Sequence, residues 1–286
     1  MAVLNKIAAL IKDPPPTYLF ELSEAGLAYA RGTETGFHRF EPGTLLPSPV
    51  EDNLLRADAI LSAIGAAAPG NGSKKKRPAA VILPDYAARV SVLDFDSFPS
   101  APEEQRSLVR FRFKKTIPFD IDSASVSYFV QPAASRKKID VLAVIVALEV
   151  IARYEALFRG AGFHPGSITT STLAALNLYH GSGIAVFAKL CGRALTVAVI
   201  SGEAIKLFRC VTLEESSEAE ILGVLYPTFA YVEDELGAPV NRLILCGLPL
   251  ELARGLRCEA EPLRSRFGLP GPYDAGLLGY LESIQN

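Results

Sequence analysis

Residues 100–130 read SAPEEQRSLVRFRFKKTIPFDIDSASVSYFV, and the rest of the chain can be organised around this stretch. Ser100 precedes Glu103 by three residues, with a proline between them in the first turn, which is the pattern of a helix start with a reciprocal cap. The helix is expected to end at the Ile-Pro-Phe sequence of residues 117–119, because the residue before a proline is pushed out of the helical conformation. Alternating apolar and polar residues over 125–131 then predict a half-buried strand.

The predicted helix carries two kinds of side chain at regular spacing. Leu108, Phe111 and Lys115 are expected to share one face of this amphipathic helix. A basic stripe recurs at every fourth residue on another face, formed by Arg106, Arg110 and Lys114. Such a stripe is either a solvated surface or a charged surface that steers a partner.

Length and composition limit the classes of protein to which the chain can belong. With 286 residues, 49% of them hydrophobic, the chain can form two domains with real cores, or one domain with an insertion. A net charge of −2 argues against both a disordered chain and a general nucleic-acid-binding protein. No apolar run reaches the roughly eighteen residues that a membrane-spanning helix needs, and no signal peptide is recognisable. The four cysteines lack the spacing of zinc ligands, so we expect a reduced, soluble, cytoplasmic protein without a metal site.

The first thirteen residues form a short amphipathic segment that ends before three prolines. Its apolar residues fall on one helical face, and they are Val3, Leu4, Ile7, Leu10 and Ile11. A helix of about three turns is marginal alone, so packing on its own domain is one interpretation. Attachment to a membrane or to a partner is the other.

One order of elements occurs twice in the chain. The first set is expected to comprise strands at 18–22, 27–31 and 36–41, a helix at 53–66 and a buried strand at 79–83. The second set is expected to comprise strands at 184–190, 194–200 and 204–211, a helix at 214–236 and a buried strand at 242–246. Two further helices are expected at 249–257 and 273–283. This structural repeat indicates a pair of ribonuclease-H-like halves.

A smaller block interrupts the first half. It is expected to contain a strand at 90–95, the helix and corner described above, strands at 125–131 and 139–146, and a helix at 148–161. One more helix is expected at 169–179. The predicted organisation is a first half at 1–88, an inserted subdomain at 89–163, a returning helix at 164–180 and a second half at 181–286.

The inserted block and several short motifs carry a resemblance to a known family. The motifs are Leu-Pro-Asp at 83–85, the strand and helix over 142–162, residues 204–209, Leu-Cys-Gly at 245–247 and Gly-Leu-Leu-Gly at 276–279. In these features the chain resembles the PilM family of type IV pilus assembly proteins, in the actin-like superfamily. The cytoplasmic part of the secretion protein GspL and the cell-division protein FtsA are more distant relatives. The resemblance implies an actin-like α/β fold of two ribonuclease-H-like halves with an inserted β-α-β-β-α subdomain.

Active members of the superfamily hold nucleotide with an Asp-x-Gly hairpin in each half. The aspartates position Mg²⁺ or its waters, and the glycines let backbone N–H groups approach the phosphates. By resemblance, the matching positions are Glu21 and Ser23 in the first hairpin and Lys189 and Cys191 in the second. The Gly-Gly that lies against adenosine in relatives is matched by residues 246–247, Cys246 and Gly247. The helical subdomain that closes over the nucleotide is expected to be reduced or absent, because the helix at 214 follows the preceding strand almost directly.

These replacements predict a vestigial nucleotide site, without catalysis and without a cofactor. The opposite charges of Glu21 and Lys189 further predict that the two side chains pair across the cleft without a ligand. The alternative is an ATP-binding protein or ATPase with an atypical site, in which Lys189 holds a phosphate as a point charge and Mg²⁺ is present. No other catalytic motif competes with these two interpretations.

The resemblance also implies a partner. It favours a non-catalytic scaffold of a type IV pilus or a related secretion or competence machine, peripheral at the cytoplasmic face of the inner membrane. The partner would be the cytoplasmic tail of a PilN-like membrane protein, held as an extended peptide near the junction of the inserted block and the first half. The expected partner-binding residues combine the basic stripe with apolar anchors, and they are Arg106, Arg110, Phe113, Lys114, Ile117 and Phe119. The alternative for Phe113 and Phe119 is a place in the core of the block. A membrane tether through the first twelve residues is a third class of function.

Overall fold

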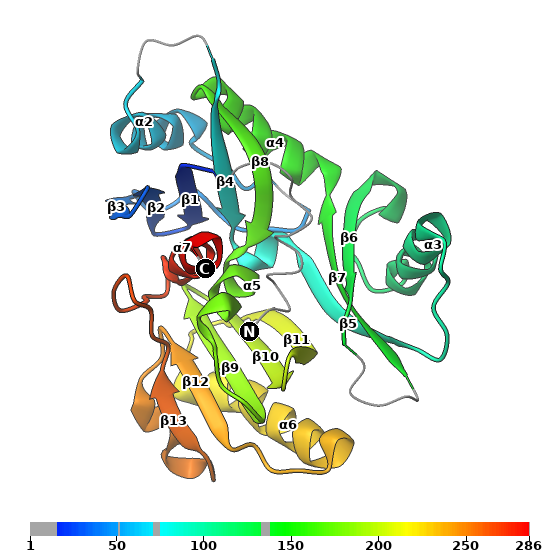
Figure 1. Ribbon diagram of the computed structural model, residues 1–286. Coiled ribbons are helices and arrows are strands. Elements are labelled where there is room, and N and C mark those ends of the chain that lie inside the picture. The colour runs from blue at the N-terminus through cyan, green and yellow to red at the C-terminus, as the bar shows by residue number, and fades with distance from the viewer. Residues whose placement is uncertain (1–15, 51, 71–74, 133–137, 286) are drawn as a thin grey trace. The chain divides into compact units, whose positions relative to one another are not determined.

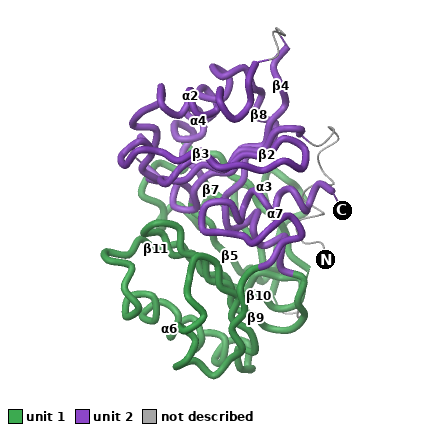
Figure 2. Tube along the Cα trace, turned by 90° about the vertical axis from the view of Figure 1, so that its left-hand side faces the viewer, with its two compact units in different colours: residues 1–7, 89–145, 180–263 green, residues 8–88, 146–179, 264–286 purple. Residues whose placement is uncertain are grey.

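The computed structural model describes residues 16–50, 52–70, 75–132 and 138–285, which form two compact units. Unit 1 contains Arg89–Ile145 and His180–Leu263, and unit 2 contains the described residues up to Ala88 together with Val146–Tyr179 and the chain from Arg264 onward. Figure 2 shows unit 1 in green and unit 2 in purple. The amphipathic segment predicted over residues 1–13 lies outside the described residues.

Unit 2 is built on a mixed five-stranded sheet with the order β3-β2-β1-β4-β8. The first three strands form the predicted antiparallel meander, and the last two run parallel to β1. Their bounds are β1 Tyr18–Ser23, β2 Gly26–Arg31, β3 Glu34–Arg39, β4 Arg77–Leu83 and β8 Phe163–Thr170. Strand β8 was not predicted, because its sequence FHPGSITT contains proline and glycine and lacks alternation.

Helices cover both faces of this sheet. Phe20 of β1 packs on Phe158 and Phe163, with ring centroids 5.1 and 5.0 Å apart, whereas its neighbour Leu19 belongs to a cluster with Leu277. Successive strand residues thus point to opposite faces, as the pleat requires. The helices of unit 2 are α2 Ala57–Ala67, α4 Leu148–Gly160, α5 Ser171–Ala175 with the 3₁₀ turn η3 Leu176–Leu178, and α7 Ala275–Gln285 (Figure 1).

Three predictions about these helices need correction. The helix expected at 169–179 begins only after β8, as α5. Helix α4 was assigned to the inserted block, but its Phe158 packs on the sheet of unit 2 and its Tyr154 hydroxyl donates to Asn53 at 3.3 Å. Helix α7 was assigned to the second half, but its leucines pack on β1 and β2. An amphipathic helix shows in its sequence that it buries a face, but not against which sheet.

The larger sheet of unit 1 repeats this arrangement with the order β11-β10-β9-β12-β13. Its strands are β9 Ile184–Cys191, β10 Ala194–Ser201, β11 Ala204–Thr212, β12 Arg242–Cys246 and β13 Glu259–Pro262. Helix α6, Glu218–Leu236, begins at a capping box in which Ser217 and Glu220 satisfy each other's backbone N–H groups. Residues 213–217 alone connect β11 to α6. The helix expected at 249–257 is a 3₁₀ segment, η4 Leu250–Gly255, and the short strand β13 was not predicted.

The inserted block forms a three-stranded sheet with the order β5-β7-β6, covered by helix α3 (Figure 1). Its elements are β5 Arg89–Phe95, α3 Pro102–Phe113, η2 Ile121–Ser123, β6 Ala124–Val130 and β7 Ile139–Ala147. The predicted Ser100 cap is wrong, because the N-cap residue is Ala101 and no side chain caps the helix. The helix also ends four residues earlier than expected, where the N–H groups of Thr116 and Ile117 turn back to the carbonyl of Phe113.

The inserted sheet is attached to strand β11 of the same unit. The side-chain amide of Gln131, which is 4% exposed, donates to the carbonyl of Ile205 and accepts from its N–H, both at 2.7 Å. Lys206 forms a largely buried ion pair with Asp140 at 2.5 Å. Buried polar groups are costly unless they are satisfied, so these contacts specify how the block docks on the second half's sheet.

Candidate functional site

The carboxylate of Glu21 is buried and engaged by groups of its own unit. The side chain is 1% exposed, its Oε2 accepts the backbone N–H of Leu277 at 2.6 Å, and its Oε1 accepts the hydroxyl of Ser171. Ser23, at the end of the same strand, donates its hydroxyl to the carbonyl of Gly26 at 3.1 Å. Both side chains therefore stabilise the β1–β2 hairpin and its contact with α5 and α7. Sequence analysis did not identify Ser171 or Leu277, because both are far from β1 in the chain.

Two glycines bring α7 into this contact. A Cβ at Gly276 would lie 2.9 Å from Glu21 Oε1 and 2.8 Å from the carbonyl oxygen of Ser171. A Cβ at Gly279 would lie 2.1 Å from the carbonyl oxygen of Ala174. Real Cβ atoms do not approach oxygen this closely, so only glycine permits the two helices to pack here. The two glycines of the Gly-Leu-Leu-Gly motif are therefore required sterically, because a side chain at either position would overlap α5.

A second buried carboxylate lies at the start of α5. Asp85, 6% exposed, accepts the backbone N–H of Thr172 at 2.7 Å and the Thr172 hydroxyl at 2.6 Å. Asp85 follows β4 in the 3₁₀ turn η1, Asp85–Ala87. The pair joins the turn after the central strand to the first turn of α5, so the Leu-Pro-Asp motif has a structural role in this unit.

The matching positions of the second half lie in unit 1. Lys189, 1% exposed, is near the end of β9, with Thr196 and Cys246 as its register partners on the neighbouring strands. Cys191 is half-buried at the β9–β10 hairpin, Cys246 is buried, and Gly247 after it is exposed. The predicted pairing of Lys189 with Glu21 joins groups of different units and stays a prediction.

These residues do not fit a Mg²⁺-nucleotide site of the kind that active relatives use. Such a site needs carboxylates directed at the ion and glycine backbones directed at the phosphates. Here the Glu21 carboxylate is held by a hydroxyl and an N–H, and a buried cation, Lys189, stands at the second position. No group of His, Cys, Asp and Glu side chains among the described residues could hold a metal ion.

We therefore expect no measurable binding of Mg-ATP, because the site lacks both phosphate glycines. Isothermal titration of the whole chain with Mg-ATP checks this expectation, with a thermal melt in the same buffer as the control. Micromolar affinity, or a clear rise in melting temperature with nucleotide, would instead favour the ATP-binding alternative, since a ligand of the native state must raise its stability.

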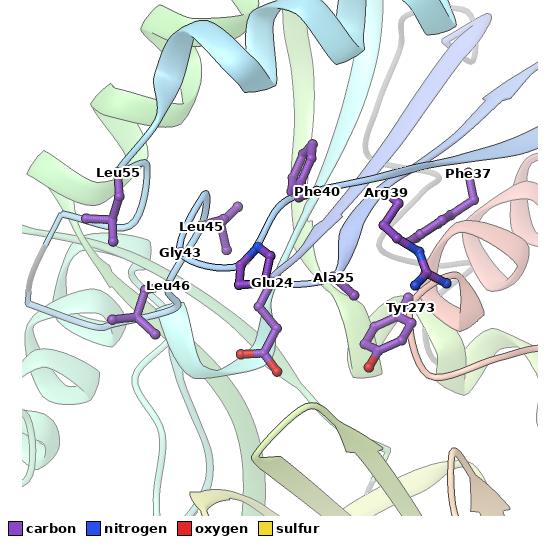
Figure 3. Close-up of a pocket in the computed structure, with 11 residues that line it drawn as sticks. Glu24, Ala25, Phe37, Arg39, Phe40, Gly43, Leu45, Leu46, Leu55 and Tyr273 are labelled. Carbon is purple, nitrogen blue, oxygen red and sulfur yellow. The ribbon is translucent and has the colours of Figure 1, made fainter.

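The described residues of unit 2 also form an open pocket of about 490 Å³ next to the β1–β2 hairpin. Figure 3 shows leucines on one side of this pocket and aromatic side chains with Arg39 on the other. The rings of Phe37 and Tyr273 lie 6.2 Å apart, centroid to centroid. The lining residues are Glu24, Ala25, Phe37, Arg39, Phe40, Pro42, Gly43, Leu45, Leu46, Leu55 and Tyr273. We call this feature the β3 pocket.

Three large hydrophobic side chains that line the β3 pocket are exposed to solvent. They are Phe37, Leu46 and Leu55, with exposed fractions of 44%, 49% and 52%. Exposed apolar residues are common singly, but a group of them beside a pocket marks an interaction site. Residues 42–49 lie between the strand expected at 36–41 and the helix expected at 53–66, and no binding site was predicted there. The sequence feature that could have indicated this apolar surface is the pair of leucines at 45–46 inside a loop rich in proline.

The six residues predicted to bind the partner do not form one exposed surface. Phe113 is 2% exposed in the core of the inserted block, so it is not a surface anchor in this structure. Ile117 and Phe119 are partly buried against the same core. Arg110 donates to the carbonyls of Ile121 and Ala124 and so holds η2 to the helix. Of the six, Arg106 and Lys114 are exposed.

The apolar face of α3 was also predicted incorrectly. Val109 and Phe113 are buried, with 0% and 2% exposure, and Leu108 packs beside them. Phe111 is 72% exposed on the outer side of the helix. Both sets of residues have helical spacing, so periodicity alone does not choose between them.

Two aspartates of the inserted block, Asp94 and Asp120, form contacts within the block. Asp120 accepts the backbone N–H of Asp122 at 3.1 Å, which is a turn contact. Asp94 forms ion pairs with Lys138 at 2.6 Å and Arg112 at 3.3 Å. The hydrogen bond from Lys138 lowers the pKa of the Asp94 carboxyl.

Comparison with known proteins defines the fold. No protein-family model matches the sequence, and no curated protein sequence matches it either. Among solved structures, the PilM–PilN type IV pilus biogenesis complex contains a chain with a TM-score of 0.71 at 14% identity, covering 96% of this chain and 100% of that one. The cytoplasmic domain of EpsL, an inner-membrane component of the Vibrio cholerae type II secretion system, gives 0.53 at 12% identity, covering 94% of both chains. A Bacteroides thetaiotaomicron protein with an actin-like ATPase fold gives 0.51 at 11%, covering 97% of this chain and 98% of that one. The chain therefore has the actin-like fold, as predicted.

Proposed function

We propose that the protein is a non-catalytic, actin-like scaffold of a type IV pilus or related secretion machine. In this proposal it binds the cytoplasmic tail of a PilN-like membrane protein in the β3 pocket. The observation that carries the proposal is the apolar pocket with its exposed leucines, in a fold shared with the PilM chain of the PilM–PilN complex. The partner would hold the scaffold at the cytoplasmic face of the inner membrane. No helix among the described residues is both long and apolar enough to cross a bilayer.

The chemistry of the β3 pocket suits a short apolar peptide. Its volume lies within the range of ordinary ligand pockets, which is about 300–1,000 Å³. Aromatic residues and arginine are the side chains that most often dominate binding energy at interfaces, and this pocket has Phe37, Tyr273 and Arg39. Leucines opposite them would receive aliphatic side chains of an extended segment.

The altered nucleotide site supports the non-catalytic part of the proposal. The buried groups at Glu21 and Asp85 satisfy hydrogen bonds within unit 2. Buried carboxylates with satisfied hydrogen bonds hold a fold in place. We infer that this region now serves packing.

The test is titration of the whole chain with a synthetic peptide that copies the cytoplasmic tail of the PilN-like protein. Leu46→Glu should weaken binding by about tenfold or more, because it places a charge in the contact surface. Leu269→Glu is the matched control, since Leu269 is 78% exposed in the same unit and does not line the pocket. Equal affinities for the two variants would contradict this assignment of the pocket.

A salt series separates the two binding modes that the chain offers. Binding in an apolar pocket should change little between low and high ionic strength, whereas binding to the basic stripe should weaken strongly. Lys114→Glu should therefore leave the affinity for the tail peptide unchanged. A large loss of affinity for the peptide in that variant would instead place the peptide on the basic stripe of α3 that the sequence predicted.

A further inference from the structure

The outer surface of helix α3 is not explained by the packing of the inserted block. Its inner face is complete, because Val109 and Phe113 fill the core with Ile121 and Ala124. On the outer side, Phe111 exposes 72% of its surface to solvent. Nothing in the fold requires a large aromatic side chain there, and alanine would be the better helix former.

Positive charge gathers at the C-terminal end of α3, next to this exposed ring, whereas the exposed Glu103 and Glu104 lie in the first turn of the helix. Residues 106–119 contain five lysines and arginines and no aspartate or glutamate. Two of the five are bound locally, since Arg110 holds backbone carbonyls and Arg112 pairs with Asp94. Arg106 is exposed but precedes Phe113 by seven residues, so it lies on the side of α3 that carries this buried ring. Lys114 and Lys115 are exposed and follow Phe111 by three and four residues, which places them next to its ring. Lysines after a helix C-terminus complement the helix dipole, but that effect does not account for the exposed phenylalanine before them.

We propose that this outer face, defined by Phe111, Lys114 and Lys115, docks directly on an anionic lipid surface. The cations are attracted to lipid headgroups, and the Phe111 ring inserts among them. This contact goes beyond the proposed tail binding, and it does not involve the β3 pocket.

The shape of the site favours a membrane over an acidic peptide. Helix α3 covers one side of its sheet (Figure 1), and Phe111 on this helix is 72% exposed, whereas a peptide needs a groove in which to bury its side chains. The pocket described above lies in unit 2, and none of its lining residues belongs to α3. A soft, flat, charged surface complements an exposed ring beside two lysines.

The fluorescence of one introduced tryptophan can report on this contact, because the chain has none of its own. Phe111→Trp places a single tryptophan at the proposed contact, and its emission can be excited selectively over that of the ten tyrosines. With vesicles that contain roughly one third phosphatidylglycerol, the emission should shift to shorter wavelength, because the ring leaves water. Vesicles of phosphatidylcholine alone should produce no shift. Tyr226→Trp is the matched control, since Tyr226 is 51% exposed on α6 of the same unit and should not respond.

Co-sedimentation of the whole chain with the same vesicles measures the contribution of each group. Phe111→Ser should lower the partition coefficient by about tenfold, and Lys114→Glu with Lys115→Glu by at least about tenfold. All these positions are exposed, so a thermal melt should show unchanged folding. These variants keep the N-terminal segment intact, so unchanged partitioning in all of them would overturn the proposal. An emission shift with polyglutamate but not with vesicles would also overturn it, in favour of an acidic protein partner.

Discussion

Replacing Gly279 with valine is expected to destabilise unit 2 by about 3 kcal/mol or more. The physical reason is the backbone contact between α7 and α5, where a Cβ would lie 2.1 Å from the carbonyl oxygen of Ala174. Backbone cannot rotate away as a side chain can, so the two helices must separate. This separation would also pull the Leu277 N–H from the Glu21 carboxylate. Urea unfolding of the whole chain measures the loss.

The matched control is another glycine inside a helix. Gly223 lies in α6, and a Cβ there would meet nothing within 4 Å. Gly223→Ala should leave stability unchanged or raise it by up to about 1 kcal/mol, because alanine is the better helix former. A Gly279 variant as stable as the Gly223 variant would show that the close helix contact does not exist in solution.

Removing the Asp85 carboxylate is expected to cost about 2–4 kcal/mol. Asp85→Ala leaves the Thr172 N–H at the start of α5 without its partner, together with the Thr172 hydroxyl, in a place that water does not reach. Buried donors without acceptors lose the hydrogen bonds that they would make to water in the unfolded chain. Thermal or urea unfolding of the variant measures this cost.

Two further variants separate this effect from the loss of charge. Asp85→Asn keeps an acceptor oxygen for the Thr172 N–H and should cost only about 1 kcal/mol. Asp96→Ala removes an exposed carboxylate and should change stability by less than about 0.5 kcal/mol. If Asp85→Ala were as mild as Asp96→Ala, the hydrogen bonds to Thr172 would not hold α5 in place.

The contact network of unit 2 connects these predictions to function. Glu21, Asp85 and the two α7 glycines contact the same short helix, α5. In this chain they join β1, the turn after β4, α5 and α7 into one packed cluster. Loss of packing should therefore affect the β3 pocket indirectly, since Tyr273 comes just before α7. Peptide titration of the destabilised variants should accordingly be made only under conditions where they are folded.

Much of this organisation follows from sequence, because strands and helices leave local periodic patterns. Two sets of strand, strand, strand, helix and strand were correctly placed, as were the three strands of the inserted block. The short connection between β11 and α6 was also predicted, since only a few residues precede the next helix pattern. The identities of Ser23 and Cys191, on which the predicted vestigial site rests, come from the sequence alone.

Tertiary structure decided the features that depend on contacts between distant residues. Periodicity on α3 fits both Phe111 and Phe113 as the buried residue, and only the sheet beneath it selects Phe113. Helices α4 and α7 each present an apolar face, but the sequence does not name the sheet that receives it. The same holds for the β3 pocket, whose lining comes from the hairpin, the following loop and the segment before α7. A side chain's exposure is set by what the folded chain brings against it, and local spacing contains no information about that partner.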